Sequence, residues 1–334
     1  MTTIAEGIKL GTPPLQYPNP IQYDSRTFTH RRLTEVLETA REVPFDDSSR
    51  IVFFSDCHRG DNSRIDAFAR NEKLFLHALT HYYREGFTYI EVGDGDELWH
   101  NRRFSNVRQA HGHVFDWLHE FDRQNRLHLI LGNHDLHNGQ RNVVEKDGIV
   151  AREGLVLRHS RTGQRIFAVH GHQADTKSDR FCAISRLVVR HIWRPLRFLG
   201  FGTVPGRRED IQRGKMTDED RVIKWLRAWE ARIEQRIVKI SREMIERRIV
   251  DWLQSHWQIT ICGHTHRPVC AAHGTPYFNA GSCVYPGYIT GLEIRDGEIA
   301  LIKWSSRSGH RGPQRIRYTL LAPPRKLRLF IGPS

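Results

Sequence analysis

Acidic, imidazole and amide side chains recur in short clusters along this 334-residue sequence. The clusters are Asp56-Cys57-His58, Gly93-Asp94, Gly132-Asn133-His134-Asp135, His170-Gly171-His172 and Gly263-His264-Thr265-His266. Carboxylate, imidazole and amide oxygen together suit a pair of borderline-hard divalent ions, and thiolate ligands are not required. Burying so many such groups without a cation would cost desolvation free energy that nothing offsets. The clusters therefore predict a two-metal site in which Asp94 bridges the ions.

The spacing within two clusters also favours metal binding. Asp56 and His58 are two residues apart, as are His264 and His266. Side chains two apart in an extended chain point to the same side, so each pair can face one ion. Cys57 then points to the opposite face of its strand, and we expect it in the core.

Each cluster directly follows a short run of β-branched and aromatic residues. The runs are Ile51–Phe54, Tyr89–Val92, Leu127–Leu131, Ile166–Val169 and Ile259–Ile261. Helical patterns over Ala69–Arg84 and Asn106–Phe121 lie between some of them. Strands alternating with helices indicate an α/β fold with a mostly parallel sheet, which binds ligands at the carboxyl ends of its strands.

The C-terminal part of the sequence predicts a second kind of sheet. Runs at Val269–Ala272 and Tyr277–Asn279 precede a hairpin of Ile289–Ile294 and Ile299–Trp304 around Asp296-Gly297. We interpret these as antiparallel strands, so that two sheets pack together.

Two segments flank or interrupt this pattern. A proline-rich arm opens the chain and precedes a short helix expected over Thr29–Glu42. Residues 180–257 interrupt the alternation, and their apolar spacing from Val222 to Trp252 predicts a long amphipathic helix. Before it, four arginines share one helical face: Arg186, Arg190, Arg194 and Arg197. This face is either the solvated side of a cap helix or a surface for an amphiphile.

The charge is distributed unevenly. Lys and Arg number 51 against 38 Asp and Glu, a formal net charge of +13. Basic residues outnumber acidic ones two to one between residues 180 and 250, and no acidic residue follows Lys303. The rest of the chain is slightly acidic, so the anionic partner that the charge indicates would meet the insertion or the tail.

Composition excludes several classes of protein. The apolar fraction of 39% is that of a folded globular protein. No apolar run reaches the roughly 20 residues that span a bilayer, and no secretory signal opens the sequence. Five cysteines without a C-x-x-C pair favour a reducing compartment. We therefore expect a cytoplasmic protein, with peripheral attachment to the inner face of the membrane as an open alternative.

The order of the clusters resembles that of the calcineurin-like metallophosphoesterase superfamily, over about Arg50 to Pro286 without most of the insertion. The resemblance implies a four-layer α/β/β/α sandwich with a helical insertion as a cap. It divides the chain into an arm and short helix (1–49), a metallophosphoesterase domain (50–305) interrupted by the insertion (180–257), and a basic tail (306–334).

The resemblance also implies roles for the clustered residues. One metal ion would bind Asp56, His58, Asp94 and His266, and the other would bind Asp94, Asn133, His170 and His264. Mn²⁺ is the favoured ion, with Fe or Zn as alternatives. His134 would protonate the leaving group or stabilise the transferring phosphoryl group, and Asp135 would orient its ring.

A narrower resemblance is to UDP-2,3-diacylglucosamine hydrolases, the pyrophosphatases of lipid A synthesis. Gly93 to Trp99 matches their Gly-Asp-x-x-Glu-x-Trp pattern, and Gly263 to Pro268 reads Gly-His-Thr-His-Arg-Pro as theirs does. The chain departs from that family at His134, where the family has Arg, and at His172, where it has Asp. In that family a helical insertion forms the acyl-chain cap.

These observations favour metal-dependent hydrolysis of a phosphoester or pyrophosphate bond in a phosphorylated small molecule or lipid, such as a UDP-diacylglucosamine-like amphiphile. Candidate substrate contacts are Arg59, Glu97, His172 and Arg267. The alternatives are a nuclease or cyclic-nucleotide phosphodiesterase, with nucleic acid as the partner, and a membrane-associated binding protein with a vestigial metal site. An anionic membrane surface is a further candidate partner.

Overall fold

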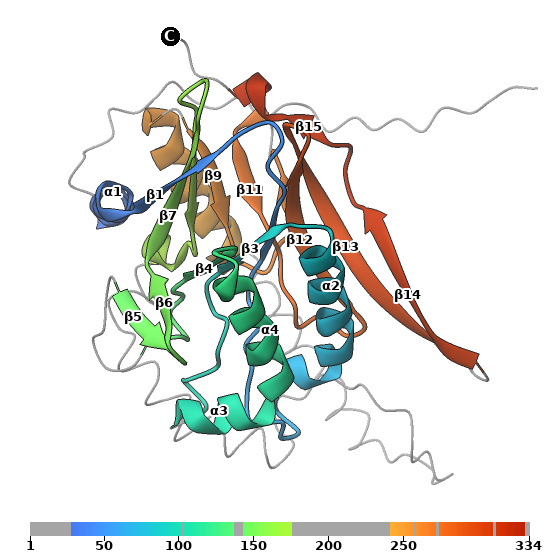
Figure 1. The fold of residues 1–334 in the computed structure, drawn as a ribbon. Helices are drawn as coiled ribbons and strands as arrows, with labels where there is room; N and C mark the ends of the chain where they lie inside the picture. Colours follow the sequence, from blue (N-terminus) through green and yellow to red (C-terminus); the bar gives the residue numbers. More distant parts are fainter. Residues whose placement is uncertain are drawn as a thin grey trace, which may run out of the picture.

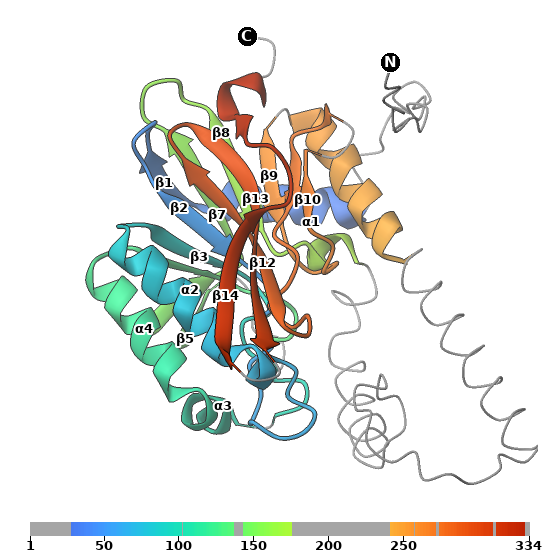
Figure 2. The ribbon, with the colours of Figure 1, turned by 90° about the vertical axis from the view of Figure 1, so that its right-hand side faces the viewer.

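Two β-sheets pack face to face in the computed structural model of the chain, and helices cover the outer face of each (Figures 1 and 2). The structure describes residues 28–101, 103–136, 143–175, 241–256, 258–271, 274–309 and 312–330.

The larger sheet has nine strands in the order β14-β13-β12-β2-β3-β4-β6-β5, with β15 paired to β13. Its strands are β2 (Ile51–Phe54), β3 (Thr88–Val92), β4 (Leu127–Ile130), β5 (Val143–Lys146), β6 (Ile149–Arg152), β12 (Tyr288–Arg295), β13 (Glu298–Gly309), β14 (Gly312–Leu320) and β15 (Arg325–Lys326). Pairing is parallel from β2 through β3 and β4 to β6 and antiparallel elsewhere. Helices α2 (Glu72–Arg84), α3 (Phe104–Ala110) and α4 (Gly112–Arg123) lie on its outer side.

The smaller sheet has six strands in the order β1-β7-β8-β9-β11-β10. They are β1 (Arg41–Phe45), β7 (Gly154–His159), β8 (Arg165–Val169), β9 (Ile259–Cys262), β10 (Val269–Cys270) and β11 (Tyr277–Asn279). The helix α1 (Phe28–Thr39) and a helix over residues 241–256 pack on its outer face. The antiparallel expectation for the C-terminal strands holds for the β10–β11 pair and for the β12–β13 hairpin, but β11 also pairs in parallel with β9.

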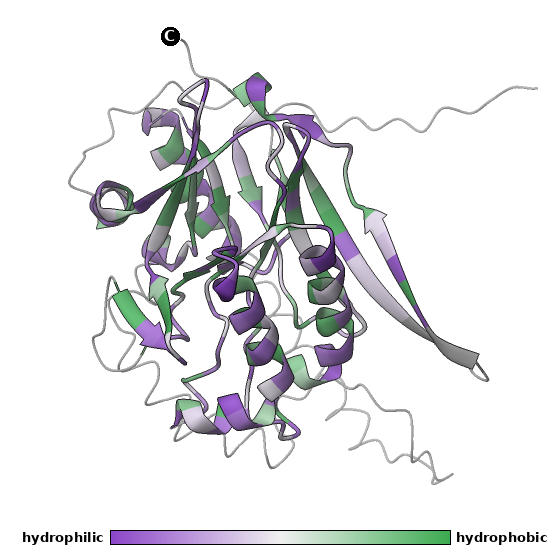
Figure 3. Ribbon diagram, in the orientation of Figure 1, coloured by the Kyte–Doolittle hydropathy of each residue, from purple (hydrophilic) through white to green (hydrophobic). Residues whose placement is uncertain are grey.

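Three apolar clusters fill the three interfaces between layers. In β2, Val52 and Phe54 pack toward α2 and α4, whereas Ile51 and Phe53 pack against the other sheet. A third cluster joins the smaller sheet to α1 and the helix over residues 241–256. Strands buried on both faces carry near-continuous apolar runs, which Figure 3 shows in green along both sheets. These layers confirm the predicted four-layer sandwich.

Two predicted helices differ from those observed. The helix expected over Asn106–Phe121 is broken into α3 and α4 at His111, whose buried ring lies 2.8 Å from the Asp66 carboxylate through Nε2. The first helix ends at Thr39 rather than Glu42, because residues 41–45 pair with β7 as an edge strand. Pro44 is accommodated there because an edge strand leaves one side of its backbone unpaired.

Most of the predicted insertion, including its arginine face, lies outside the described residues. Its last part, residues 241–256, is helical and buries Ile245, Ile249 and Trp252. The larger sheet continues past residue 305, the predicted end of the domain, through the rest of β13 and the paired β14. Among the described residues, no helix has the length and apolar content to span a membrane.

Candidate metal centre

The predicted clusters meet at one edge of the sandwich, where β2, β3 and β4 of one sheet and β8 and β9 of the other end. Backbone hydrogen bonds connect the loops within each sheet. The amide of His58 donates to the carbonyl of Asp94 over 2.8 Å, and that of Gly263 donates to His170 over 3.0 Å. The amide of His264 donates to Asp56 Oδ2 over 3.0 Å and so joins the two sheets at the site.

The backbone at five of the cluster residues is left-handed, although the two-residue spacing of Asp56 and His58 and of His264 and His266 predicted an extended chain. Asp56 and His58 have φ of 54° and 48°, and Asp94, His264 and His266 have φ of 50°, 64° and 53°. Such values are uncommon for residues other than glycine and cost free energy. The chain accepts this strain at five of the seven positions where the resemblance places metal ligands. Cys57 is buried in the apolar cluster beneath the larger sheet, as expected.

Two glycines are required by close approach of other groups. A Cβ on Gly263 would lie 1.8 Å from Ser55 Oγ, and one on Gly93 would lie 2.5 Å from the His170 ring. Gly93 also has a φ of +78°. Both positions therefore exclude larger residues, which explains why glycine precedes the ligands in these motifs.

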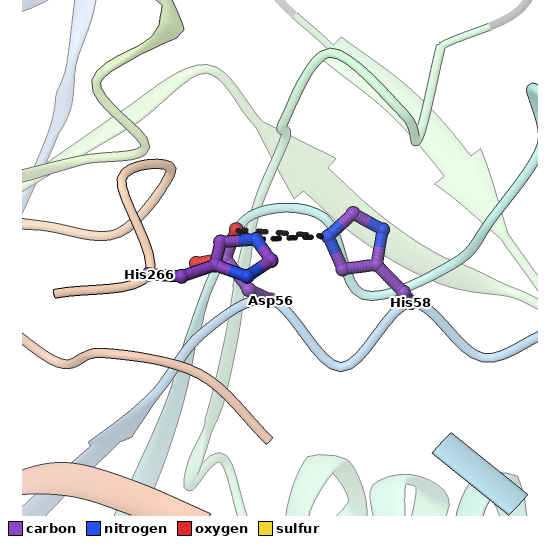
Figure 4. Close-up of side chains that lie close together, drawn as sticks. All are labelled: Asp56, His58 and His266. Carbon is purple, nitrogen blue, oxygen red and sulfur yellow. Dashed lines mark hydrogen bonds and ion pairs between the residues drawn. The ribbon is translucent and has the colours of Figure 1, made fainter. Parts of the chain in front are cut away.

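The first group of candidate ligands is Asp56, His58 and His266 (Figure 4). Asp56 Oδ1 lies 3.0 Å from His266 Nε2 and 3.8 Å from His58 Nε2, and the two nitrogens are 3.3 Å apart. Asp56 is fully buried, and Oδ1 accepts no hydrogen bond from the described residues. A buried carboxylate oxygen facing two imidazole nitrogens is the donor set of a divalent cation site.

The second group is Asp94, His170 and His264. His170 Nδ1 lies 2.8 Å from the Val92 carbonyl and donates to it, which turns Nε2 toward Asp94 Oδ2 at 3.1 Å. Within the described ranges His170 Nε2 has no hydrogen-bond partner although the residue is fully buried. An imidazole held by a backbone carbonyl through one nitrogen is oriented to bind metal through the other.

Asp94 connects the two groups. Its Oδ2 lies 3.8 Å from His58 Nε2 as well as 3.1 Å from His170 Nε2, and its Oδ1 accepts from the amide of His134 over 2.8 Å. Asn133, the remaining predicted ligand, is 2% exposed on the same turn as His134. The geometry therefore brings six of the seven predicted ligands together in two groups around a shared carboxylate.

The electrostatics of the centre also fit cations. Burial opposes ionisation of Asp94, yet the imidazoles of His170 and His134 outweigh it and hold the pKa of that carboxyl far below its usual range. Burial likewise opposes the charge of His170, but attraction to Asp94 and Asp56 raises its pKa to about 9. Without metal, these carboxylates hold a proton on an imidazole. A divalent cation would replace that proton.

Glu97, expected as a substrate contact, lies behind two histidines. Its Oε2 is 3.0 Å from His58 Nδ1, and its Oε1 is 2.9 Å from His134 Nδ1. Each imidazole then donates through Nδ1, which leaves Nε2 of His58 available to bind a metal ion and Nε2 of His134 facing away from Glu97. The ring of His134 also stacks on Trp99, with centroids 4.0 Å apart.

Two expected roles need correction. Asp135 does not orient His134: its carboxylate accepts from the amides of Asp96 and Gly132 and from Lys146 Nζ. Arg59 is 1% exposed and cannot reach a substrate, because its guanidinium is held by Glu91 and Asp96 at 2.6 to 2.8 Å. Both residues instead belong to a buried ionic network beneath the loops.

The other two proposed contacts lie at the centre and at its edge. His172 is buried beside His170 and His264, with ring centroids 5.6 and 6.4 Å away. Burial, then the neighbouring imidazoles, hold its pKa well below the usual range. Arg267 is more exposed and lies 3.3 Å from Glu246.

Sequence reasoning missed the supporting residues Glu91, Lys146 and Asp175. Asp175 Oδ2 lies 3.5 Å from His264 Nε2, and Lys146 pairs with Asp96 and Asp135. An acidic residue inside the apolar strand β3 was a usable signal for Glu91. Lys146 and Asp175 carry no comparable signal, because polar residues at loop ends are common.

Comparisons with known proteins show no family for this chain. No family model matches the sequence, and no curated protein does. Among solved structures, the chain is similar to Vps29 of Chaetomium thermophilum, with 9% identity, a TM-score of 0.36, and coverage of 83% of this chain and 97% of that one. The fold and site described above therefore rest on this chain's own strand order and contacts.

Proposed function

We propose that the protein is a metal-dependent hydrolase of phosphoester or pyrophosphate bonds. The observation that carries the proposal is the position of Asp94, whose carboxylate belongs to one group of buried and half-buried imidazole and carboxylate donors and also lies near His58 of the other. The orphaned Asp56 Oδ1 and His170 Nε2 fit cations, and the mixture of oxygen and nitrogen donors favours Mn²⁺, Fe or Zn over Ca²⁺.

The residues that would hold two cations are the predicted ligands, with Asp94 shared. Two bound cations would neutralise phosphate oxygens and lower the pKa of a water molecule. The chain's own contribution is orientation. Glu97 holds the His134 ring through Nδ1, and Trp99 supports one face of that ring. When the His134 ring is protonated on both nitrogens, Nε2 is the atom that would donate a proton to the leaving oxygen or a hydrogen bond to the phosphoryl group.

Two substrate classes have separate support. The Gly93 to Trp99 pattern favours a UDP-diacylglucosamine-like amphiphile, with a membrane surface as the source of substrate. The exposed Arg315 and Arg317 of β14 and the half-buried Tyr288 of β12 favour a nucleotide phosphodiester. A panel of UDP-diacylglucosamine, dinucleoside polyphosphates, cyclic nucleotides and single-stranded DNA separates them.

The test of the activity itself is Mn²⁺-dependent hydrolysis of bis(p-nitrophenyl) phosphate. We expect turnover by the wild type, its loss in Asp94→Ala, and its retention in Asp116→Ala, a change of the same charge at an exposed site on α4. No metal-dependent turnover by the wild type on this ester or on the substrate panel would contradict the proposal and favour a binding protein with a vestigial site.

A further inference from the structure

A strip of cationic and aromatic side chains extends from the metal centre along β12, β13 and β14. Tyr288 pairs with Ser305, and Ser305 pairs with Arg317, so these three residues form one row across the strands. Paired residues and residues two apart along a strand share a face. Lys303 and Arg315 therefore lie on the same face as this row.

The cations of this strip are not neutralised by the residues that the structure describes. Arg315 and Arg317 are exposed, and among the described side chains neither they nor Lys303 forms an ion pair. Lys303 Nζ instead lies 4.1 Å from the centre of the Tyr288 ring. Because no acidic residue follows Lys303 in the sequence, the local field stays positive along the hairpin.

The aromatic end of the strip adjoins the metal centre. The rings of Tyr285 and Tyr288 stack with centroids 4.7 Å apart, and the Tyr285 hydroxyl donates to the carbonyl of His266. β12 runs antiparallel to β2, with Leu292 opposite Phe53, so its Tyr288 end lies at the carboxyl end of β2 near Asp56. The long hairpin of β13 and β14 extends from this end of the sheet (Figure 1).

We propose that this strip binds single-stranded nucleic acid, with phosphates on Lys303, Arg315 and Arg317 and bases against the tyrosine pair. Alternate residues of β14 are about 7 Å apart, which matches a repeating anionic backbone, and aromatic rings beside cations are the usual platform for unpaired bases. A membrane fits less well, because the exposed apolar residues Tyr318 and Leu320 lie on the opposite face of β14.

The experiment measures binding of a fluorescent oligothymidylate to the full chain by anisotropy, in EDTA and over a series of salt concentrations. We expect Arg315→Ala/Arg317→Ala to bind about tenfold more weakly and to lower the salt slope by about 1.4, or about 0.7 for each lost phosphate contact. Tyr288→Ala should bind about tenfold more weakly with an unchanged slope, and Tyr288→Phe should bind normally.

The matched control is Arg123→Ala/Arg158→Ala, which removes two exposed arginines from α4 and β7. Circular dichroism checks that each variant is folded. The proposal would be overturned if Arg123→Ala/Arg158→Ala weakened oligonucleotide binding as much as Arg315→Ala/Arg317→Ala does, or if the latter variant kept the wild-type salt slope. It would also be overturned if the protein bound anionic phosphatidylglycerol vesicles but not the oligonucleotide. Because EDTA removes metal, this result is independent of whether the proposed hydrolysis occurs.

Discussion

Glu97 decides the state of two histidines at the centre. By accepting from Nδ1 of both His58 and His134, its carboxylate fixes which nitrogen of each ring is free. A single amide in its place could accept through only one oxygen. Metal affinity and proton donation should therefore depend on one side chain that is not among the seven predicted metal ligands.

Glu97→Gln tests this role. We expect Mn²⁺ affinity and kcat/KM to fall by about 10- to 100-fold, the usual effect of losing a group that orients a metal ligand. Isothermal titration and steady-state kinetics measure the two quantities. Glu120→Gln, at a half-buried position on α4 away from the metal centre, should change neither, and unchanged affinity in Glu97→Gln would contradict the role.

Metal binding should depend on pH through His170. Its pKa near 9 in the metal-free protein means that a bound proton stabilises the fold below about pH 6.5 and that this stabilisation is lost as pH rises through 9. A metal ion binds only the neutral form of the His170 ring. The affinity of the protein for Mn²⁺ should therefore rise by up to about tenfold per pH unit until pH 9. The increase in Tm on adding Mn²⁺ should thus be larger at pH 8.5 than at pH 6. An increase that is the same at both would contradict this assignment.

The candidate ligands could be picked out of the sequence because their types and order are unusual, whereas the residues that contact them could not. The resemblance implied that Asp135 orients His134, but the Asp135 carboxylate accepts from Lys146, and Glu97 contacts the His134 ring instead. Glu97 reaches His134 from a different loop, a contact that only the folded sheet order creates.

At the scale of elements, the five strands before the clusters were predictable from their apolar runs. Strands β1, β5, β6 and β7 were not predicted. β1 and β5 lie at sheet edges and have weak patterns, whereas the interior strands β6 and β7 carry short apolar runs that were a usable signal. The loops at the strand ends are held from beneath by the buried network of Arg59, Glu91, Asp96, Lys146 and Asp135. This network replaces the apolar packing that such loops lack.

Lys146→Met should be strongly destabilising. It leaves the carboxylates of Asp96 and Asp135 buried without this cation, at a cost of about 3 to 5 kcal/mol. Urea unfolding with EDTA present measures the change without a metal contribution. Lys73→Met, at an exposed position on α2, should cost less than about 0.5 kcal/mol, and equal losses in the two variants would refute a structural role for the network.

At the scale of the whole molecule, the two sheets pack face to face, and ionisable side chains gather at the edge where the candidate ligands lie. Apolar clusters hold the layers together elsewhere, but at the ligand edge Asp56, Asp94 and His170 are buried with little apolar contact. Bound cations would therefore act as a link between the sheets, adding about 2.7 kcal/mol of stability at 100 times their dissociation constant.

Chelation should weaken that link. We expect EDTA to lower the Tm of the wild type and to leave the Tm of Asp94→Ala unchanged, as measured by calorimetry. A wild-type Tm that does not respond to EDTA or to added Mn²⁺ would mean that cations do not join the sheets.

The most direct measurement of the central claim is the number of Mn²⁺ ions bound by each chain, from isothermal titration of the metal-free protein. The two groups around Asp94 predict two ions for the wild type, loss of both from tight binding in Asp94→Ala, and two ions in Asp116→Ala. A wild type that binds no Mn²⁺, or an Asp94→Ala variant that binds it as the wild type does, would contradict the account.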